Sequence, residues 1–315
     1  MQDAYGRTIR YLRISVTDQC NYCCRYCKDA GQTHGYGFRE TLSKEEIAGI
    51  VRCAAECGID KIRLTGGEPL MRADIAEICS LIRAIPGVKE LTLTTNGSLL
   101  KKTAAGLKAA GVDRLNISID TLDPERFRVI TRTGNLSDVL EGIDAAEAAG
   151  FTNLKLNTVL IGGFNEDEIP AFVGLTEKRP VSVRFIELMP IGIAAQWGKD
   201  RFLSSETVLK AVPELEEIET DGVASVFRVP GYTGTVGLIH PITGKFCDRC
   251  DRVRLTSDGK LKPCLHSPLE FSLRGLEGDD LMKAFREAIW GKPKEHSVDP
   301  LHPSSAGRRM YEIGG

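Results

Sequence analysis

Short runs of β-forming residues alternate with helical patterns from the start of the chain to about residue 190. Strand, helix and strand in succession imply right-handed crossovers and a parallel sheet. The expected strands cover residues 10–16, 61–65, 90–94, 114–119, 154–160 and 181–187. The expected helices cover residues 43–58, 75–85, 99–110, 137–149 and 167–177, the first opening on a Ser43–Glu46 capping box. This order predicts an α/β fold, either a curled, partly closed barrel or an open doubly wound sheet.

The expected strands have one apolar and one polar face. Leu12 and Ile14 flank Arg13 in the first strand, and Arg63 and Lys155 occupy polar positions in the second and fifth. A parallel sheet buried on both faces should consist of nearly continuous hydrophobic runs. A curled sheet can instead turn its polar face toward a ligand-filled interior. We favour the curled sheet, although inward salt bridges would also explain each single cation.

The pattern changes after about residue 190. A short helix is expected over residues 204–212, strands over 223–230 and 235–239, and a longer helix over 276–290. We therefore expect two units, a barrel over residues 1–212 and a C-terminal extension over residues 213–315.

Composition excludes several classes of protein. Lys and Arg number 41 against 43 Asp and Glu, a net charge of −2, whereas a general nucleic-acid binder has a basic excess. No apolar run approaches the roughly 18 residues that span a bilayer, and the first residues lack the core of a signal peptide. We expect a cytoplasmic protein that binds neither nucleic acid nor a membrane and keeps its cysteines reduced.

Three cysteines follow the first expected strand in a C-x3-C-x2-C pattern: Cys20, Cys24 and Cys27. Three thiolates on a tight loop can hold three irons of a 4Fe–4S cube and leave the fourth iron open to another ligand. A zinc knuckle completed by Cys23 or His34 is the alternative. This segment alone does not distinguish the two.

The second expected strand ends in Gly66-Gly67-Glu68-Pro69, at the edge where α/β barrels place ligand sites. Glycine lets the backbone approach a ligand closely, and Glu68 can accept a hydrogen bond from an ammonium group. In isolation this segment is more often an ordinary turn. After a three-cysteine loop it indicates a ligand site.

A second group of three cysteines near the end of the chain has the spacing C-x2-C-x13-C. Its members are Cys247, Cys250 and Cys264. His266 would complete a zinc site, which in isolation is favoured over a cluster. Arg252 and Arg254 share one face of an extended segment beside these cysteines, and paired guanidinium groups suit a phosphate.

These motifs, with Thr-Asn-Gly at 95–97 and Asn-Ile-Ser-Ile-Asp at 116–120, resemble the radical S-adenosylmethionine superfamily. Over essentially the whole chain the sequence resembles one family within it, the GTP 3′,8-cyclases, or molybdenum cofactor biosynthesis proteins A. The further matching segments are Gly6-Arg7, residues 12–18, residues 185–189, the second cysteine group and the terminal Gly314-Gly315. The resemblance implies a partial (β/α)6 barrel of the TIM type, with a C-terminal extension that carries a second iron–sulfur cluster.

The resemblance also implies site residues at matching positions. Two 4Fe–4S clusters would be bound by the trios Cys20, Cys24, Cys27 and Cys247, Cys250, Cys264. S-adenosylmethionine would be bound by Tyr26, Gly66, Gly67, Glu68, Ser118 and Met189. GTP would be held by Arg13, Arg63, Thr94, Lys155, Arg184, Arg252, Val253 and Arg254. The residues that assist catalysis would be Gly314, Gly315, Arg252 and Arg254.

The implied reaction is a radical cyclisation. Cleavage of S-adenosylmethionine at the first cluster gives a 5′-deoxyadenosyl radical, which removes the ribose 3′ hydrogen of GTP. The resulting carbon radical attacks C8 of guanine and gives (8S)-3′,8-cyclo-7,8-dihydroguanosine 5′-triphosphate, in the first step of molybdenum cofactor biosynthesis. The resemblance further implies a reductant such as flavodoxin or ferredoxin, a functional link to cyclic pyranopterin monophosphate synthase, and a homodimer.

The sequence departs from the family pattern after Cys27, where Lys28-Asp29-Ala30 replaces the usual Met-Pro, and at Cys23, where a non-cysteine is usual. Two other functions stay open: a radical peptide maturase with an auxiliary cluster, and a non-catalytic protein with two zinc sites. A maturase would not need so many inward cations, and metal analysis would identify a zinc protein.

Overall fold

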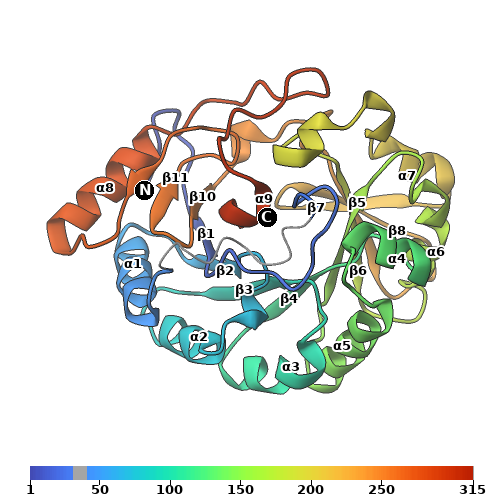
Figure 1. Ribbon diagram of the computed structural model, residues 1–315, viewed down its shortest axis with the longest axis horizontal. Coiled ribbons are helices and arrows are strands. Elements are labelled where there is room, and N and C mark those ends of the chain that lie inside the picture. Colours follow the sequence, from blue (N-terminus) through green and yellow to red (C-terminus); the bar gives the residue numbers. More distant parts are fainter. Residues whose placement is uncertain (31–40, 315) are drawn as a thin grey trace.

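The structure, a computed structural model, describes residues 1–30 and 41–314. Its described strands join one twelve-stranded sheet that curls around the centre of the molecule, with helices on the outside (Figure 1). The strands are β1 (Tyr11–Ser15), β2 (Lys61–Thr65), β3 (Glu90–Thr95), β4 (Arg114–Ser118), β5 (Lys155–Leu160), β6 (Ser182–Glu187), β7 (Glu216–Asp221), β8 (Ala224–Arg228), β9 (Thr235–Ile239), β10 (Arg252–Leu255), β11 (Lys260–Lys262) and β12 (Phe271–Ser272). The helices are α1 (Lys44–Glu56), α2 (Ile75–Arg83), α3 (Leu100–Ala109), α4 (Pro124–Thr131), α5 (Leu136–Ala148), α6 (Ile169–Gly174), α7 (Glu206–Ala211), α8 (Gly278–Trp290) and α9 (Met310–Ile313).

Parallel strands form the centre of the sheet, in the order β1 to β6. The next strand on each side is also parallel: β10 beside β1, and β9 beside β6. Antiparallel strands follow at both edges, β11 and β12 beyond β10, and β8 and β7 beyond β9. The C-terminal part of the chain therefore extends the barrel sheet on both sides.

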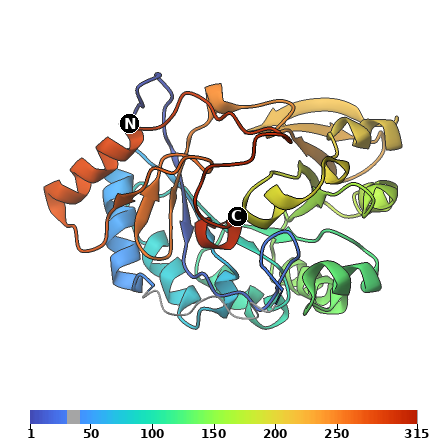
Figure 2. The same cartoon turned by 45° about the horizontal axis from the view of Figure 1, so that its top comes forward.

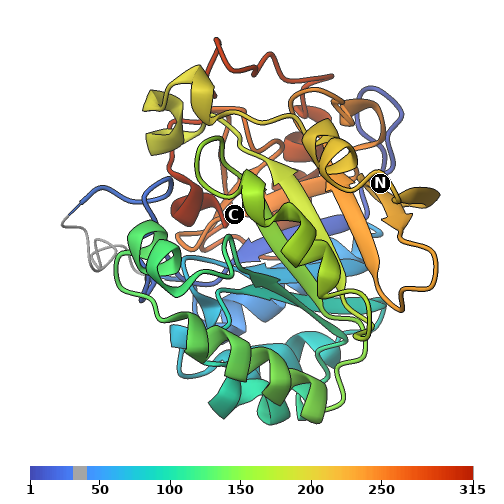
Figure 3. The same ribbon diagram turned by 90° about the vertical axis from the view of Figure 1, so that its right-hand side faces the viewer.

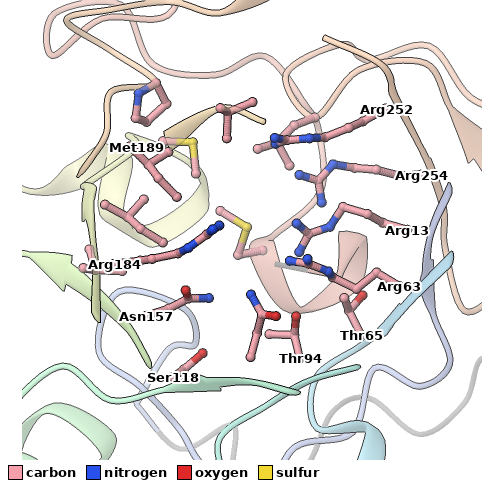
Figure 4. Close-up of a pocket in the computed structure, with 18 of the residues that line it drawn as sticks. Arg13, Arg63, Thr65, Thr94, Ser118, Asn157, Arg184, Met189, Arg252 and Arg254 are labelled. Carbon is pink, nitrogen blue, oxygen red and sulfur yellow. The ribbon is translucent and has the colours of Figure 1, made fainter. Parts of the chain in front are cut away.

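The strand register aligns three arginines. Arg13 of β1 pairs with Arg63 of β2 on one side and with Arg254 of β10 on the other. Paired positions on neighbouring strands point to the same face of a sheet. The three side chains consequently form one row, and Figure 4 shows them one above another at the wall of the central cavity.

The apolar face of the sheet packs against the helices outside it, as the alternation of residues predicts. Leu12 and Ile14 of β1 are fully buried there, together with Ile47 of α1 and Ile78 of α2. Figure 1 shows α1 and α2 outside the strands, and Figure 3 shows the green helix α5 along the outside of the sheet in another view. The polar face is left for the interior of the curl, so the curled sheet is confirmed and the open sheet is not formed.

Most expected helices are present, with two differences. Ser43 and Glu46 form the expected capping box at α1. Helix α4 was not expected, although Asp123 accepts hydrogen bonds from the first-turn N–H groups and a proline follows it. Residues 167–177, expected as one helix, form a 3-10 turn (Glu166–Glu168) and then α6, because Pro170 lacks the N–H that a longer helix would need.

Beyond residue 190 the expected strands correspond to β8 and β9, and the expected helices to α7 and α8. The edge strands β7, β11 and β12 were not expected as strands. The division at residue 212 stays a prediction, and the sheet is continuous across that position. Among the described residues, no helix combines the length and apolar character that crossing a membrane requires.

Candidate active site

A cavity of about 550 Å³ lies inside the curled sheet and is lined by both groups of three cysteines. Side chains from every central strand point into it, and Figure 4 shows arginines on one wall and Met189, Arg184 and Asn157 on the opposite wall. Since the two cysteine groups lie more than two hundred residues apart in the sequence, the fold has brought them to one chamber.

The first cysteine group forms a tight loop after β1. The backbone N–H groups of Cys27 and Lys28 both donate to the carbonyl oxygen of Cys24, at 2.9 Å. Burial raises the pKa of Cys20 to about 11 and that of Cys27 to about 12, and it raises the pKa of Cys24 as well, with the neighbouring thiols adding to the effect. Thiols gathered in this way become thiolates when a metal centre compensates their charge, so the loop fits a bound cluster.

Cys23 is separated from the other three cysteines of the loop. Its side chain is buried, its Sγ contacts the carbonyl oxygen of Asp29 at 3.3 Å, and it does not line the cavity. Cys20, Cys24 and Cys27 do line it. The geometry therefore supports the trio that the spacing suggested and leaves Cys23 outside it; His34, the other alternative ligand, lies outside the described residues.

Arg132, between α4 and α5, holds this loop in place by hydrogen bonds to its backbone. Its Nη1 donates to the carbonyl oxygens of Cys23 and Lys28, at 2.9 and 2.8 Å. Arg132 adopts a left-handed backbone conformation, with φ of 63°, which costs energy for a residue other than glycine. Nothing in the sequence predicts these contacts of Arg132, because a left-handed backbone at an arginine cannot be read from residue type.

The two glycines after β2, Gly66 and Gly67, allow their backbone to pack directly against the backbone of residues 17–19. The N–H of Gly67 donates to the carbonyl oxygen of Thr17 at 2.7 Å, and that of Glu68 donates to Gln19 at 2.7 Å. A Cβ at Gly67 would lie only 2.3 Å from the Gln19 oxygen. The glycines line the cavity, but their close approach is to the segment that leads into Cys20.

Glu68 does not line the cavity. Its buried carboxylate accepts hydrogen bonds from the Thr95 hydroxyl at 2.7 Å, from the N–H of Asn96 at 2.7 Å and from the N–H of Leu70 at 3.0 Å. Burial nevertheless raises the pKa of Glu68 to about 7. Its observed contacts thus tie β2 to the end of β3, whereas the sequence suggested an acceptor for an ammonium group.

The remaining candidates for S-adenosylmethionine line the cavity near the first cysteine loop: Tyr26, Ser118 and Met189. The Tyr26 hydroxyl donates to Asp120 at 2.6 Å, and the Tyr26 ring meets Trp197 edge-on at a centroid distance of 6.4 Å. Asp120 follows β4 and is buried, which raises its pKa. The sequence did not single out Asp120 or Trp197 for this site.

Cations dominate the polar wall of the cavity. The members named from the sequence are Arg13, Arg63, Lys155, Arg184, Arg252 and Arg254, and Arg114 joins them. Burial and the nearby Arg184 and Arg114 lower the pKa of Lys155 to about 8, and burial and Arg252 lower that of Arg254 to about 10. Such mutual repulsion is relieved by a bound polyanion, so this wall fits a triphosphate.

One carboxylate, Asp221 at the end of β7, meets two of these cations. Lys155 donates to Asp221 at 2.6 Å, and Arg184 also pairs with it. These contacts lower the pKa of Asp221 to about 2, although burial opposes the shift. Several other polar atoms of the wall have no hydrogen-bond partner among the described residues: the Thr94 hydroxyl, Asn116 Oδ1, Asn157 Oδ1 and Arg184 Nε. Such atoms indicate space for a polar ligand.

Arg252 and Val253 take different positions on β10. The guanidinium of Arg252 lies 5.3 Å from the ring centroid of Phe246 and 5.9 Å from that of Tyr11, and it lines the cavity. Val253 is fully buried in the core on the opposite face of the strand. Its side chain therefore does not reach the cavity, as the alternation of a strand requires.

The second cysteine group also lines the cavity. Lys292 donates to the carbonyl oxygens of Arg252 and Pro263, at 2.8 and 2.7 Å. Although burial opposes the shift, Lys292 and Arg252 lower the pKa of Cys250. Burial raises the pKa of Cys247, so this trio, like the first, fits a metal centre that compensates the charge of its thiolates.

His266 lies beside this group and shares a hydrogen bond of 3.1 Å with the Ser304 hydroxyl. Burial and His296 lower the pKa of His266 to about 3, so its ring is neutral. Among residues 1–30 and 41–314, no three His, Cys, Asp or Glu side chains are placed to share one metal ion. In a cluster each thiolate binds a different iron, and its ligands lie further apart.

The C-terminal tail enters the chamber, and α9 lies at the centre of the ring in Figures 1 and 2. Arg254 donates to the carbonyl oxygen of Gly314 at 2.7 Å. Gly314 has a φ of 76°, and a Cβ there would lie 2.1 Å from the Thr65 hydroxyl. Glycine is therefore required at this position, whereas Gly315 lies outside the described residues.

Two family models match the chain. The one described as "Radical SAM superfamily" matches residues 14–175, and "Molybdenum Cofactor Synthesis C" matches residues 181–298. The chain is 48% identical to a GTP 3′,8-cyclase of Alkaliphilus oremlandii over 100% of both chains. It is 49% identical to one of Peptoclostridium acidaminophilum, over 99% of this chain and 98% of that one, and 41% identical to one of Listeria monocytogenes, over 100% and 99%.

Solved structures share the fold. Streptococcus suis SuiB bound to S-adenosylmethionine matches with a TM-score of 0.61 at 14% identity, over 89% of this chain and 66% of SuiB. The anSMEcpe protein with bound AdoMet matches with a TM-score of 0.59 at 14% identity, over 97% of this chain and 84% of that one. The expected α/β barrel with a C-terminal extension is confirmed. The full-length relatives favour neither a maturase nor a zinc protein.

Proposed function

The chain belongs to the GTP 3′,8-cyclase family of radical S-adenosylmethionine enzymes, and from that premise we propose that the central cavity is its active site. The protein is a cyclase of molybdenum cofactor biosynthesis that acts on GTP with two 4Fe–4S clusters and S-adenosylmethionine. One observation carries the assignment of the site: a single chamber is lined by two cysteine trios and by a wall rich in cations.

The first trio, Cys20, Cys24 and Cys27, would hold one cluster, and Tyr26, Gly66, Gly67, Ser118 and Met189 would surround S-adenosylmethionine beside it. The second trio, Cys247, Cys250 and Cys264, would hold the other cluster near the guanine base. When bound, these cofactors supply the electron and the adenosyl radical that the cyclisation needs. The protein's own residues act by positioning the nucleotide between the two ends of the chamber.

The row of Arg13, Arg63 and Arg254, with Arg252, Lys155 and Arg184 around it, would bind the triphosphate. Planar guanidinium groups bind phosphate oxygens in pairs, which fixes orientation as well as affinity. Thr94 would add a hydroxyl donor, since its Oγ1 has no partner among the described residues. Val253 would contribute only through its backbone, because its side chain lies in the core.

The tail would close the chamber. Gly314 accepts a hydrogen bond from Arg254 and abuts Thr65, so the tail lies directly beside the proposed triphosphate site. A closed chamber excludes water and other hydrogen donors from reactive species. We propose that Gly314, with Gly315, Arg252 and Arg254, assists catalysis in this way.

The test is anaerobic incubation of reconstituted, reduced protein with S-adenosylmethionine and either GTP or ATP. The proposal predicts 5′-deoxyadenosine and a cyclised nucleotide with GTP, and no cyclised product with ATP. Protein that carries both clusters and forms neither product from GTP would overturn it.

Several expectations remain proposals alongside this one. They are a flavodoxin or ferredoxin as reductant, a functional link to cyclic pyranopterin monophosphate synthase, a homodimer, a cytoplasmic location, and a division into residues 1–212 and 213–315. Each has a direct measurement, and for the homodimer this is the mass of the protein in solution.

A further inference from the structure

Lys28 directly follows the last cysteine of the first trio and is almost completely buried. Its ammonium group lies 5.0 Å from the centroid of the Tyr311 ring in α9 and 3.4 Å from the carbonyl oxygen of Cys20. A lysine is rarely buried without strong compensation. The face of the Tyr311 ring supplies part of it, as a cation–π contact.

The next residue, Asp29, also contacts the tail. Its carboxylate forms an ion pair of 2.6 Å with Arg309, which directly precedes α9. Two consecutive residues of the loop, Lys28 and Asp29, therefore contact Tyr311 and Arg309 of the tail.

The tail is thus held at Arg309 and Tyr311 by the first cysteine loop and at Gly314 by Arg254. Helix α9 has only four residues, too short to be stable without tertiary contacts. The position of Gly314 consequently depends on what holds Arg309 and Tyr311. Lys28 and Asp29 are also the residues where the sequence departs from the pattern of its family.

We propose that Lys28 and Asp29 are positioning residues, which dock the C-terminal tail on the first cluster loop and thereby place Gly314 beside the triphosphate site. This inference rests on the proposed function, because it explains how the tail reaches that site.

The first experiment is a charge exchange, since a partly exposed ion pair can be reversed without disturbing the core. Asp29→Arg and Arg309→Asp each place like charges together, and we expect each to lower kcat for the cyclised nucleotide about 5- to 10-fold. Asp29→Arg combined with Arg309→Asp restores attraction and should recover at least half of the wild-type kcat. A double variant as slow as the slower single variant would overturn the proposal.

A further readout distinguishes docking from general destabilisation. Amide hydrogen exchange at Met310–Ile313 should become faster in the single variants and return to the wild-type rate in the double variant. Unchanged exchange in the single variants would contradict docking.

The contact between the Lys28 ammonium group and the Tyr311 ring is tested by substitutions of Tyr311. Tyr311→Phe keeps the ring face toward Lys28 and should lower kcat less than Tyr311→Leu, which removes the ring and should lower kcat several-fold with unchanged iron content. Equal activity of the two variants would count against the cation–π contact. Wild-type protein runs beside every variant: if it forms no cyclised product, the proposed function fails, whereas failure of the rescue alone rejects only the docking role.

Discussion

Arg254 and Gly314 lie side by side, joined by a hydrogen bond of 2.7 Å from the guanidinium Nη1 to the glycine carbonyl oxygen. Arg254 belongs to the row of arginines proposed to bind triphosphate, and Gly314 belongs to the tail. A nucleotide that approaches Arg254 therefore also meets the tail. We expect substrate binding and tail position to influence each other.

Replacement of Gly314 by alanine should abolish most activity. The new methyl group would lie 2.1 Å from the Thr65 hydroxyl and 3.3 Å from Ser15 Cβ, and the backbone φ of 76° disfavours alanine. We expect product formation to fall at least about tenfold while iron content stays constant. Gly307→Ala is the control, because it has a similar φ of 68° but no atom within 4 Å of the new methyl. Equal effects of both changes would show that clash with Thr65 is not the cause.

Arg252→Ala and Arg254→Ala should each weaken GTP binding. A lost hydrogen bond to a charged group costs roughly 1.5–3 kcal/mol, which corresponds to about 10- to 100-fold in Kd. Titration calorimetry with GTP and with guanosine separates the phosphate contribution, and guanosine binding should change little. Iron analysis accompanies the titration, since loss of the second cluster would mean that these arginines are structural.

Cys23→Ala should leave the iron content unchanged. Its thiol contacts the Asp29 carbonyl and does not line the cavity. The next residue, Cys24, does line the cavity. Cys24→Ala should lose the first cluster, about four irons per chain. Iron quantification and the electron paramagnetic resonance spectrum of reduced protein compare the two. A Cys23→Ala protein that lacks the first cluster would place this thiol among the ligands after all.

Affinity for GTP should depend on pH through Lys155. Burial, Arg184 and Arg114 lower its pKa to about 8, and a phosphate binds the protonated amine. Affinity should therefore be complete well below pH 8 and should decrease as pH rises through 8, by up to about tenfold per unit above it. In Lys155→Arg the guanidinium keeps its charge, so this decrease should disappear. The same pH profile in both proteins would assign the decrease to another group.

Much of the barrel could be predicted from sequence, because hydrophobic alternation and helix caps are local signals. The alternation of Leu12, Arg13 and Ile14 predicted which side chain would face the interior. The Ser43 cap likewise predicted where α1 begins. Edge strand β7 gave no such signal, since all six of its residues are exposed and it has no buried face to mark it.

Contacts between distant segments could not be predicted. Nothing local at Asp221 indicates that it meets Lys155 and Arg184, because it is brought there by the pairing of β7 with β8 and of β8 with β9. The contacts of Glu68 show the same point: its residue type suits a ligand contact, and the fold places its carboxylate against Thr95 and Asn96, while its role toward S-adenosylmethionine stays a prediction. Motif similarity suggested which residues gather at the site, and only the fold shows which of them reach the cavity.

The pairing of β1 with β10 has a consequence for how the chain acquires this structure. Tyr11 pairs with Arg252, so a ribosome must complete most of the polypeptide before the first strand finds its outer neighbour. Contacts this distant in sequence form slowly, and until then the open edge of β1 is available to other chains. Chains truncated before residue 252 are therefore expected to aggregate during synthesis.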